Sequence, residues 1–97
     1  MGSFRLSDLA EADFDEIAAY SFAQWGEAQA TRYMTELDAT FAELAQTARM
    51  GRARSDLRAG ILTHPCNRHL IFFRRSPQGD VEILRILHER MDFPRHM

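Results

Sequence analysis

The sequence has no lysine, a single cysteine and no long apolar run. With Cys66 as its only cysteine, the chain forms no internal disulfide, which fits a reducing cytoplasm. No segment approaches the roughly 20 consecutive apolar residues of a membrane-spanning helix, and residues 1–5 lack the apolar stretch of a signal peptide. From these absences we expect a cytoplasmic protein with no membrane-embedded part.

The length and composition predict one globular domain. The chain has 97 residues, of which 45% are hydrophobic and 27% are charged. This is enough for one hydrophobic core and too little for two. We therefore expect a single domain over residues 1–97.

The charges are divided unequally between the two halves of the chain. Residues 1–48 hold nine acidic residues and two arginines, whereas residues 49–97 hold ten arginines and five acidic residues, for a net charge of -2. Because a guanidinium forms planar, bidentate hydrogen bonds to carboxylate or phosphate, the second half suits an acidic peptide or a nucleic acid. Charge alone does not choose between these two partners.

Two amphipathic helices are predicted in the first half. Apolar residues recur at spacings of three and four over residues 10–25. They follow Ser7, which is a favourable N-cap, and precede Gly26, which suits a helix C-terminus. A second such stripe runs over residues 30–48, and the short link makes the two helices antiparallel neighbours. Their solvent-facing sides are expected to hold most of the acidic residues, Asp13 among them.

The rest of the chain predicts a small sheet. Four short apolar segments are predicted to be extended: residues 4–6, 61–64, 70–73 and 81–87. Pro65 is expected to end the second of these, residues 76–80 form a turn, and the arginine-rich residues 46–60 form a loop. The uninterrupted apolar runs of the last two segments indicate central strands covered on both faces. The order β-α-α-β-β-β therefore predicts an α+β domain in which the helical hairpin packs on one face of a small, mainly antiparallel sheet.

The densest group of metal-ligand residue types lies in residues 64–69, which contain two histidines and Cys66. Structural zinc sites usually need four ligands, and no second pair at a suitable spacing occurs elsewhere in the sequence. No metal ion or other cofactor is therefore expected. Cys66 has no nucleophile signature around it and is expected to be a half-buried packing residue.

A ribonuclease is the main enzymatic alternative. Cleavage of RNA through its 2′-hydroxyl needs a general base, a general acid and cations near the phosphate. The candidates for these roles are Arg74, Arg75, Arg85 and His88. We favour the competing interpretation, in which strand arginines cover apolar surface with their stems and pair with acidic residues.

Three aromatic residues, Tyr20, Trp25 and Tyr33, fall on the predicted helices. Exposed aromatic side chains can stack on nucleic-acid bases. Their helical spacing instead favours packing in the core or between the helices. We therefore expect no base-stacking surface here and no sequence-specific DNA binding by the chain.

In their order and spacing, these residues resemble the ParE branch of the RelE/ParE toxin superfamily. The N-terminal half carries Arg5-Leu6-Ser7, Tyr20-Ser21, Trp25-Gly26, Gln29-Ala30 and Tyr33. The middle carries Leu57-Arg58-Ala59-Gly60, His69 and Phe73-Arg74, and the C-terminal end carries Ile86-Leu87-His88 and Met91-Asp92. The resemblance covers residues 4–96, nearly the whole chain.

The resemblance implies the RelE/ParE fold and a toxin of a type II toxin–antitoxin module. ParE toxins poison DNA gyrase and are neutralised by a ParD-like antitoxin whose disordered, often acidic segment wraps around the toxin. RelE-type relatives are instead ribosome-dependent mRNA endoribonucleases, and several use a tyrosine near the C-terminus. Both tyrosines of this chain lie on the predicted helices. A non-enzymatic gyrase inhibitor is therefore favoured, with the endoribonuclease, or a remnant that only binds antitoxin, as alternatives.

The helical hairpin and an edge of the sheet are expected to form the groove that receives the antitoxin. No catalytic residue is assigned. The residues expected to contact antitoxin or target lie in the basic half: Arg58, Arg74, Arg75 and Arg90 for charged contacts, Met91 and Phe93 for an apolar anchor, and His88.

Overall fold

The structure, a computed structural model, describes residues 2–91 and 93–96 of the chain. The helices are α1 (Asp8–Trp25), α2 (Glu27–Gln46) and the short α3 (Phe93–His96). The strands are β1 (Phe4–Leu6), β2 (Arg52–Ala53), β3 (Leu62–Cys66), β4 (His69–Arg75) and β5 (Val81–His88). Over these residues, no helix combines the length and the apolar character needed to cross a membrane.

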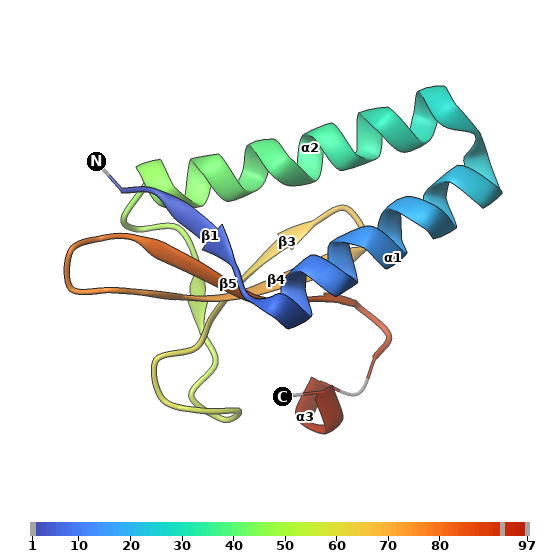
Figure 1. Ribbon diagram of the computed structural model, residues 1–97. Helices are drawn as coiled ribbons and strands as arrows, with labels where there is room; N and C mark the ends of the chain where they lie inside the picture. The colour runs from blue at the N-terminus through green and yellow to red at the C-terminus, as the bar shows by residue number, and fades with distance from the viewer. Residues whose placement is uncertain (1, 92, 97) are drawn as a thin grey trace.

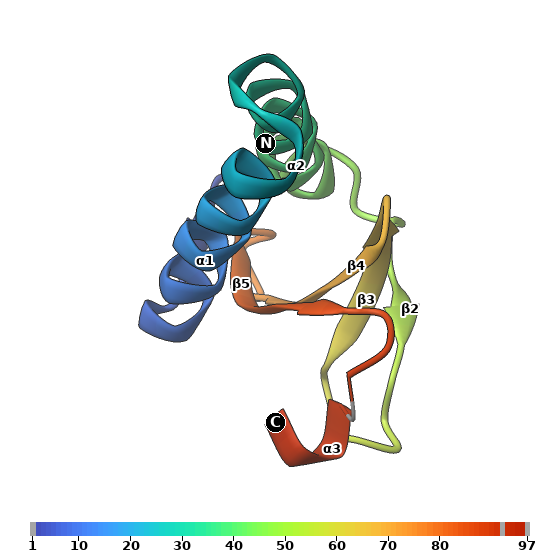
Figure 2. The same ribbon diagram turned by 90° about the vertical axis from the view of Figure 1, so that its right-hand side faces the viewer.

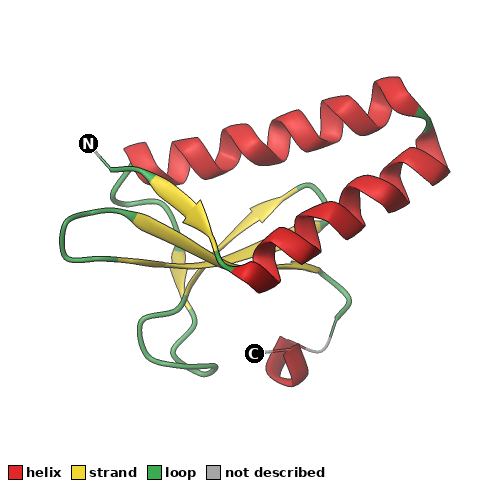
Figure 3. Ribbon diagram, viewed as in Figure 1, coloured by secondary structure: helices red, strands yellow, loops and turns green. Residues whose placement is uncertain are grey.

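The five strands form one sheet in the order β1-β5-β4-β3-β2. β1 runs parallel to β5, and all other neighbours are antiparallel. Helices α1 and α2 lie together on one face of the sheet, and α3 lies on the opposite side (Figure 1, Figure 2). Figure 3 shows the two layers by element type, with the helical hairpin in red above the yellow strands. The predicted α+β architecture is confirmed, with β4 and β5 in the central positions.

Two elements add to the predicted order: β2, inside the predicted loop 46–60, and α3 at the C-terminal end. β2 has two residues, both exposed, and pairs with Leu62 and Thr63 of β3. Because it is short and exposed, its sequence has no apolar pattern that would predict a strand. α3 is one four-residue turn, anchored by Phe93, whose ring lies 5.1 Å from that of Phe72. Both elements depend on contacts with distant residues, which a local sequence pattern does not encode.

The prediction that Pro65 ends its strand is wrong, because β3 continues through Pro65 to Cys66. Pairing between β3 and β2 stops at Leu62 and Thr63. From His64 onward β3 is therefore an edge strand, and a proline is tolerated at an edge because no neighbour needs its N–H. Beyond Cys66, Asn67 adopts a left-handed conformation with φ 55°, which allows the tight turn into β4.

The ends of the helical hairpin follow the predicted signals. The Ser7 hydroxyl accepts the Ala10 N–H at 3.1 Å and begins α1. Gly26 separates the two helices with φ 82°, a conformation that glycine adopts without steric cost. The predicted second stripe is too long: α2 ends at Gln46, and Ala45 rather than Ala48 faces the core.

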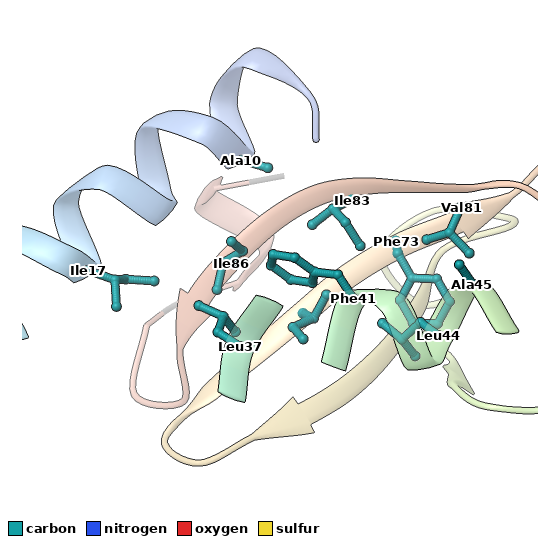
Figure 4. Close-up of a cluster of buried hydrophobic side chains, with 11 residues drawn as sticks. Ala10, Ile17, Leu37, Phe41, Leu44, Ala45, Phe73, Val81, Ile83 and Ile86 are labelled. Carbon is teal, nitrogen blue, oxygen red and sulfur yellow. The ribbon is translucent and has the colours of Figure 1, made fainter. Parts of the chain in front are cut away.

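The main core lies between the helical hairpin and the sheet. Figure 4 shows Leu37, Phe41 and Leu44 pointing from α2 toward the strands. Phe41 is fully buried, and the rings of Phe4 and Phe14 lie 5.7 Å and 6.2 Å from it. Burying a side chain of this size contributes about 1.5–3 kcal/mol, so this stripe is what holds the hairpin on the sheet.

The opposite face of the sheet is also covered, as the apolar runs of β4 and β5 predict. Ile61, Phe72 and Leu87 form a second buried cluster there, against which Leu57 and Phe93 pack. Because β4 and β5 are enclosed on both faces, their positions are fixed along most of their length. The ends of these two strands therefore present their side chains in defined places.

Helix α1 closes the edge of β5 beyond the end of β1, which pairs only as far as Ile83. The Ser7 hydroxyl donates to the carbonyl of Leu84 at 2.9 Å, and the carboxylate of Asp13 accepts the Ile86 N–H at 3.0 Å. The expectation that Asp13 lies on a solvent face is therefore wrong. Its side chain is turned inward because it satisfies a strand edge that no neighbouring strand covers.

Candidate functional site

A cavity of about 650 Å³ lies where the helical hairpin extends past one end of the sheet. We call it the end pocket. Its walls are the C-terminal half of α1, the N-terminal half of α2, the β3–β4 turn and the end of β5. Side chains that define it include Tyr20, Trp25, Tyr33, His69, His88 and Met91. Its volume is within the range of small-molecule and cofactor sites.

Five rings form a continuous row along the end pocket. Tyr20 and Trp25 meet edge to face with centroids 6.3 Å apart, and Trp25 lies 5.7 Å from Tyr33 across the helix pair. The row continues from Tyr33 to His69 at 5.8 Å and from His69 to His88 at 5.4 Å. The expected packing between helices is thus found for Trp25 and Tyr33. Tyr20 is 61% exposed and Trp25 42% exposed, however, so neither is a core residue.

The inner part of the row is polar and half-buried. The Tyr33 hydroxyl lies 2.5 Å from Nδ1 of His69. Burial raises the pKa of Tyr33, so its phenol keeps the proton. Burial, reinforced by the neighbouring His88, lowers the pKa of His69 and keeps this imidazole neutral.

The second imidazole, His88, also has its Nδ1 engaged in a hydrogen bond. Nδ1 of His88 accepts the backbone N–H of Arg90 at 3.1 Å, so in the neutral ring the proton is on Nε2. The strand pairing places His69 and His88 directly opposite each other. The floor of the end pocket therefore holds two neighbouring imidazoles whose Nδ1 atoms are both engaged within the protein.

Charged side chains surround the opening. Arg68 and Arg90 are exposed and come from the β3–β4 turn and from the residues just after β5. Glu16 and Asp13 stand on the α1 side. The carboxylate of Asp13 forms a bidentate pair with Arg85 at 2.8 Å and 2.9 Å, so its charge is neutralised within the protein.

The predicted contact residues fall in three separate places. His88, Arg90 and Met91 line the end pocket, and Met91 is 44% exposed. Arg74 and Arg75 lie at the other end of β4, five and six residues from His69. At about 3.3 Å per strand residue, that separation is roughly 20 Å.

Arg74 and Arg75 have different roles. Arg75 donates to the carbonyls of Leu44, Thr47 and Met50 at 2.8–2.9 Å and so closes the C-terminal end of α2. Arg74 is exposed and pairs with Glu82, which also binds Arg5. The predicted pairing of strand arginines with acidic residues is thus found for Arg74 and Arg85, whereas Arg75 binds main-chain carbonyls.

The remaining two predicted residues lie on the sheet face away from the hairpin. Phe93 packs on Phe72, and the guanidinium of Arg54 lies 5.8 Å from the Phe93 ring centre. Arg58 is exposed in the turn that follows β2, where its carbonyl accepts the Ile61 N–H at 3.3 Å. Neither residue lines the end pocket.

The structure does not assemble the ribonuclease group considered from the sequence. Of its four members only His88 lies in the end pocket, since Arg85 is paired with Asp13 and the other two arginines are at the far end of β4. Within residues 2–91 and 93–96, no three His, Cys, Asp or Glu side chains are arranged to hold a metal ion. Cys66 is half-buried, and its sulfur lies 3.5 Å from the Thr40 hydroxyl.

Several residues of the end pocket were not predicted as site residues, namely Tyr20, Trp25, Tyr33, Arg68 and His69. A signal for four of them was present, because Tyr20, Trp25, Tyr33 and His69 carry the resemblance described above. These positions converge on one pocket together with His88 and Met91. The residues that carry the resemblance therefore line the end pocket as well as building the fold.

The fold itself has a solved counterpart. One chain of a structure described as the chromosomal ParDE TA system from P. aeruginosa superposes with a TM-score of 0.76 at 24% sequence identity. The match covers 91% of this chain and 96% of that chain. At this level of identity the similarity establishes the fold class alone, a helical hairpin on a mainly antiparallel sheet.

Sequence comparison places the chain within that class. The family of the ParE toxin of type II toxin–antitoxin system, parDE, matches residues 4–93. Toxin ParE1 of Caulobacter vibrioides is 39% identical over 97 residues, covering 100% of this chain and 99% of that protein. Toxin ParE1 of Mycobacterium tuberculosis is 33% identical over 94 residues, covering 97% and 96%. The chain belongs to the ParE toxin family of type II toxin–antitoxin systems.

Proposed function

We propose that this toxin inhibits DNA gyrase by binding, without enzymatic activity of its own, and that a ParD-like antitoxin neutralises it. The observation that carries the proposal is the match to the ParE family along nearly the whole chain, with relatives at 33–39% identity. A gyrase inhibitor acts in the cytoplasm, where its target is. The lack of an assembled ribonuclease group among the four predicted candidates supports the non-enzymatic mechanism.

The outer side of the helical hairpin offers a groove for the antitoxin. One hollow of about 320 Å³ lies between the helices, beside Phe22 and Met34. A second of about 330 Å³ continues to the edge strand β1, beside Leu6 and Phe14. Asp38 lines both hollows. Hairpin and sheet edge thus meet in one track of apolar side chains edged by the carboxylates of Glu11, Asp15 and Asp38. Its apolar residues suit the apolar side of an antitoxin segment.

The basic residues next to this track suit an acidic part of the same segment. Arg5 and Arg74 flank a third hollow, of about 490 Å³, which adjoins β1. Both share the single carboxylate of Glu82, so positive charge remains for a partner. We propose Arg74 as an antitoxin contact, and Arg58, Arg90, His88, Met91 and Phe93 as contacts to antitoxin or gyrase.

Assays on purified gyrase test the proposal. We expect the toxin to block supercoiling, to stabilise gyrase-dependent DNA cleavage, and to lose both effects when the antitoxin is added. The same preparation is tested for mRNA cleavage on ribosomes. Cleaved mRNA with unaffected gyrase would replace the proposal by the ribosome-dependent endoribonuclease.

A growth assay tests whether the toxin is active. Expression of the chain without antitoxin is expected to stop growth, and normal growth would indicate a remnant that only binds its partner. For the contacts, Arg58→Ala, Arg74→Ala and Arg90→Ala are combined in one variant. Arg75 is left intact because it holds the end of α2. Unchanged antitoxin affinity and unchanged toxicity in this variant would contradict the assignment of these arginines.

A further inference from the structure

We propose that the end pocket binds an unpaired base of single-stranded nucleic acid, together with the neighbouring phosphates. Gyrase inhibition and antitoxin binding require no such contact by this chain, so the proposal goes beyond the function described above. It depends on the juxtaposition of an exposed aromatic row, two imidazoles and two arginines around one cavity.

The aromatic row provides a surface for stacking. Tyr20 and Trp25 remain 61% and 42% exposed although they contact each other, and Trp25 also packs against Tyr33. A large aromatic side chain held rigidly by its neighbours, with its surface open to solvent, is how single-strand-binding proteins accept bases. The row of rings continues from Tyr33 to His69 and His88. A base stacked on the outer rings would therefore have its polar edge close to the two histidines.

The pocket floor provides ring nitrogens for that edge. The Tyr33 hydroxyl and the Arg90 N–H occupy the Nδ1 atoms of His69 and His88, which leaves Nε2 of each ring for a ligand. Nucleobases carry donors and acceptors along their edges that can pair with such nitrogens. Two rings 5.4 Å apart suit a planar ligand with several polar atoms along one edge.

Two exposed arginines at the opening can bind phosphate. Arg68 and Arg90 line the end pocket together with Glu16 and with Asp13, which is paired with Arg85. An aromatic or arginine side chain of a protein partner would also stack on Trp25. The two guanidiniums beside the exposed rings favour the nucleotide, because it offers a base to stack and phosphates that a guanidinium binds in bidentate fashion.

The overhanging hairpin limits the ligand to unpaired nucleotides. Helices α1 and α2 form one wall of the cavity and the end of the sheet forms another, so a base must leave its stack to enter. Extracting a base from a duplex costs a few kcal/mol, whereas an unpaired base avoids most of that cost. Binding is therefore expected for single strands of DNA or RNA and not for a duplex.

Trp25 is the only tryptophan of the chain, so its fluorescence reports directly on the end pocket. The purified full-length toxin is titrated with a short oligodeoxynucleotide, the oligoribonucleotide of the same sequence, and the corresponding duplex. We expect the single strands to quench Trp25 and the duplex to leave it unchanged. The two single strands together tell whether DNA or RNA is preferred. Inorganic phosphate at equal ionic strength controls for salt.

Matched variants locate the binding, measured by the anisotropy of a labelled oligonucleotide. Tyr20→Ala and Trp25→Ala are each expected to weaken it about 5- to 150-fold, the range for losing one stacking partner. Phe22→Ala is the control, because Phe22 is equally exposed on the same hairpin but lines the outer groove. Tyr20 makes no core contact, so Tyr20→Ala tests the stacking even if Trp25→Ala disturbs the hairpin.

The salt dependence tests the arginines. Each phosphate that an arginine neutralises on a single strand adds about 0.7 to the slope of log affinity against log salt concentration. Arg68→Ala and Arg90→Ala are each expected to lower the slope by about that amount, and the exposed Arg49→Ala to leave it unchanged.

Four results would overturn the proposal. They are no quenching by any single strand at low salt, equal binding of the duplex, an equal loss in Phe22→Ala and Tyr20→Ala, and an unchanged salt slope in both pocket arginine variants. A Trp25 signal with purified gyrase or antitoxin, but none with oligonucleotides, would assign the end pocket to a protein partner instead.

Discussion

The pair between Asp13 and Arg85 joins the first helix to the last strand, and its removal has an effect that the structure allows us to estimate. Asp13 accepts two hydrogen bonds from the Arg85 guanidinium, at 2.8 Å and 2.9 Å, and a third from the Ile86 N–H at 3.0 Å. The side chains of Arg85 and Asp13 are only 17% and 11% exposed. Asp13→Ala would leave a guanidinium and a strand N–H without these partners.

The expected loss is about 3 kcal/mol. Removing one partner of a buried ion pair costs about 3–5 kcal/mol, and the residual exposure of both side chains favours the lower end. For a domain of this size, 1 kcal/mol shifts Tm by about 4–8 °C, so Tm should fall by roughly 12–24 °C. Asp13→Asn keeps an oxygen acceptor for Ile86 but loses the charge, and about half of the loss is expected.

Thermal and urea denaturation of the chain alone, followed by circular dichroism, measures these losses. Asp15→Ala is the matched control, since Asp15 is an exposed carboxylate on the same helix and should change stability by less than about 0.5 kcal/mol. The double variant Asp13→Ala with Arg85→Met removes the guanidinium that has lost its Asp13 partner as well. It is expected to be at least about 1 kcal/mol more stable than Asp13→Ala alone.

Two outcomes would refute this reasoning. One is a loss for Asp13→Ala no larger than that for Asp15→Ala. The other is a double variant less stable than Asp13→Ala, which would mean that loss of the Asp13 partner carries no cost at the Arg85 guanidinium. Either result would show that the cost estimated here for breaking the Asp13–Arg85 pair is wrong.

Three further predictions concern the α2 end, the following loop and the end pocket. Arg75→Met should lose about 2–3 kcal/mol in urea denaturation, because three carbonyls at the end of α2 lose their donor, whereas the exposed Arg74→Met should lose less than about 1 kcal/mol. Gly51→Ala should cost about 2–3 kcal/mol, since Gly51 has φ 111° and an added Cβ would lie 2.5 Å from a core phenylalanine ring; Gly60→Ala, with φ 86° and open space, should cost only about 1–2 kcal/mol. Burial lowers the pKa of His69 in the folded state. As pH falls below about 6.5, the unfolded chain therefore binds a proton at His69 before the folded chain does. The free energy of unfolding then decreases until the pH passes the folded pKa. His69→Gln should therefore lose less stability than the wild type between pH 7 and pH 5.5, and an equal loss would contradict the prediction.

Most of the fold follows from local sequence signals. Ser7 is a residue type that favours helix N-caps, Gly26 one that favours helix ends, and residues 76–80 are rich in turn-forming types. All three features are found where predicted. What was missed depends on distant partners. β2 exists because β3 offers it an edge, and Pro65 stays within β3 because β2 ends before reaching it. A pattern read along the chain contains neither fact.

The sequence predicts the candidate site less well than the fold. The charge and the expected exposure of a side chain do not tell which part of the structure it contacts. Arg74 and Arg75 are neighbours in the sequence, yet one binds a carboxylate at the surface and the other closes a helix end. The helical spacing of Tyr20 and Trp25 was interpreted as packing. That interpretation holds for the contact of Trp25 with Tyr33, but the spacing does not reveal that the hairpin extends past the sheet and leaves these rings exposed.

The position of His88 depends on an irregularity in β5. The turn at residues 76–80 alone would place His69 opposite Leu87, but the register shifts by one residue at Leu84, and His69 pairs with His88. Because successive side chains of a strand point to opposite faces, this bulge turns His88 toward the hairpin and Leu87 away from it. The Ser7 hydroxyl accepts the Ala10 N–H and donates to the Leu84 carbonyl, so one residue both begins α1 and supports the bulge. The end pocket therefore owes its pair of imidazoles to an N-cap about 80 residues earlier in the chain.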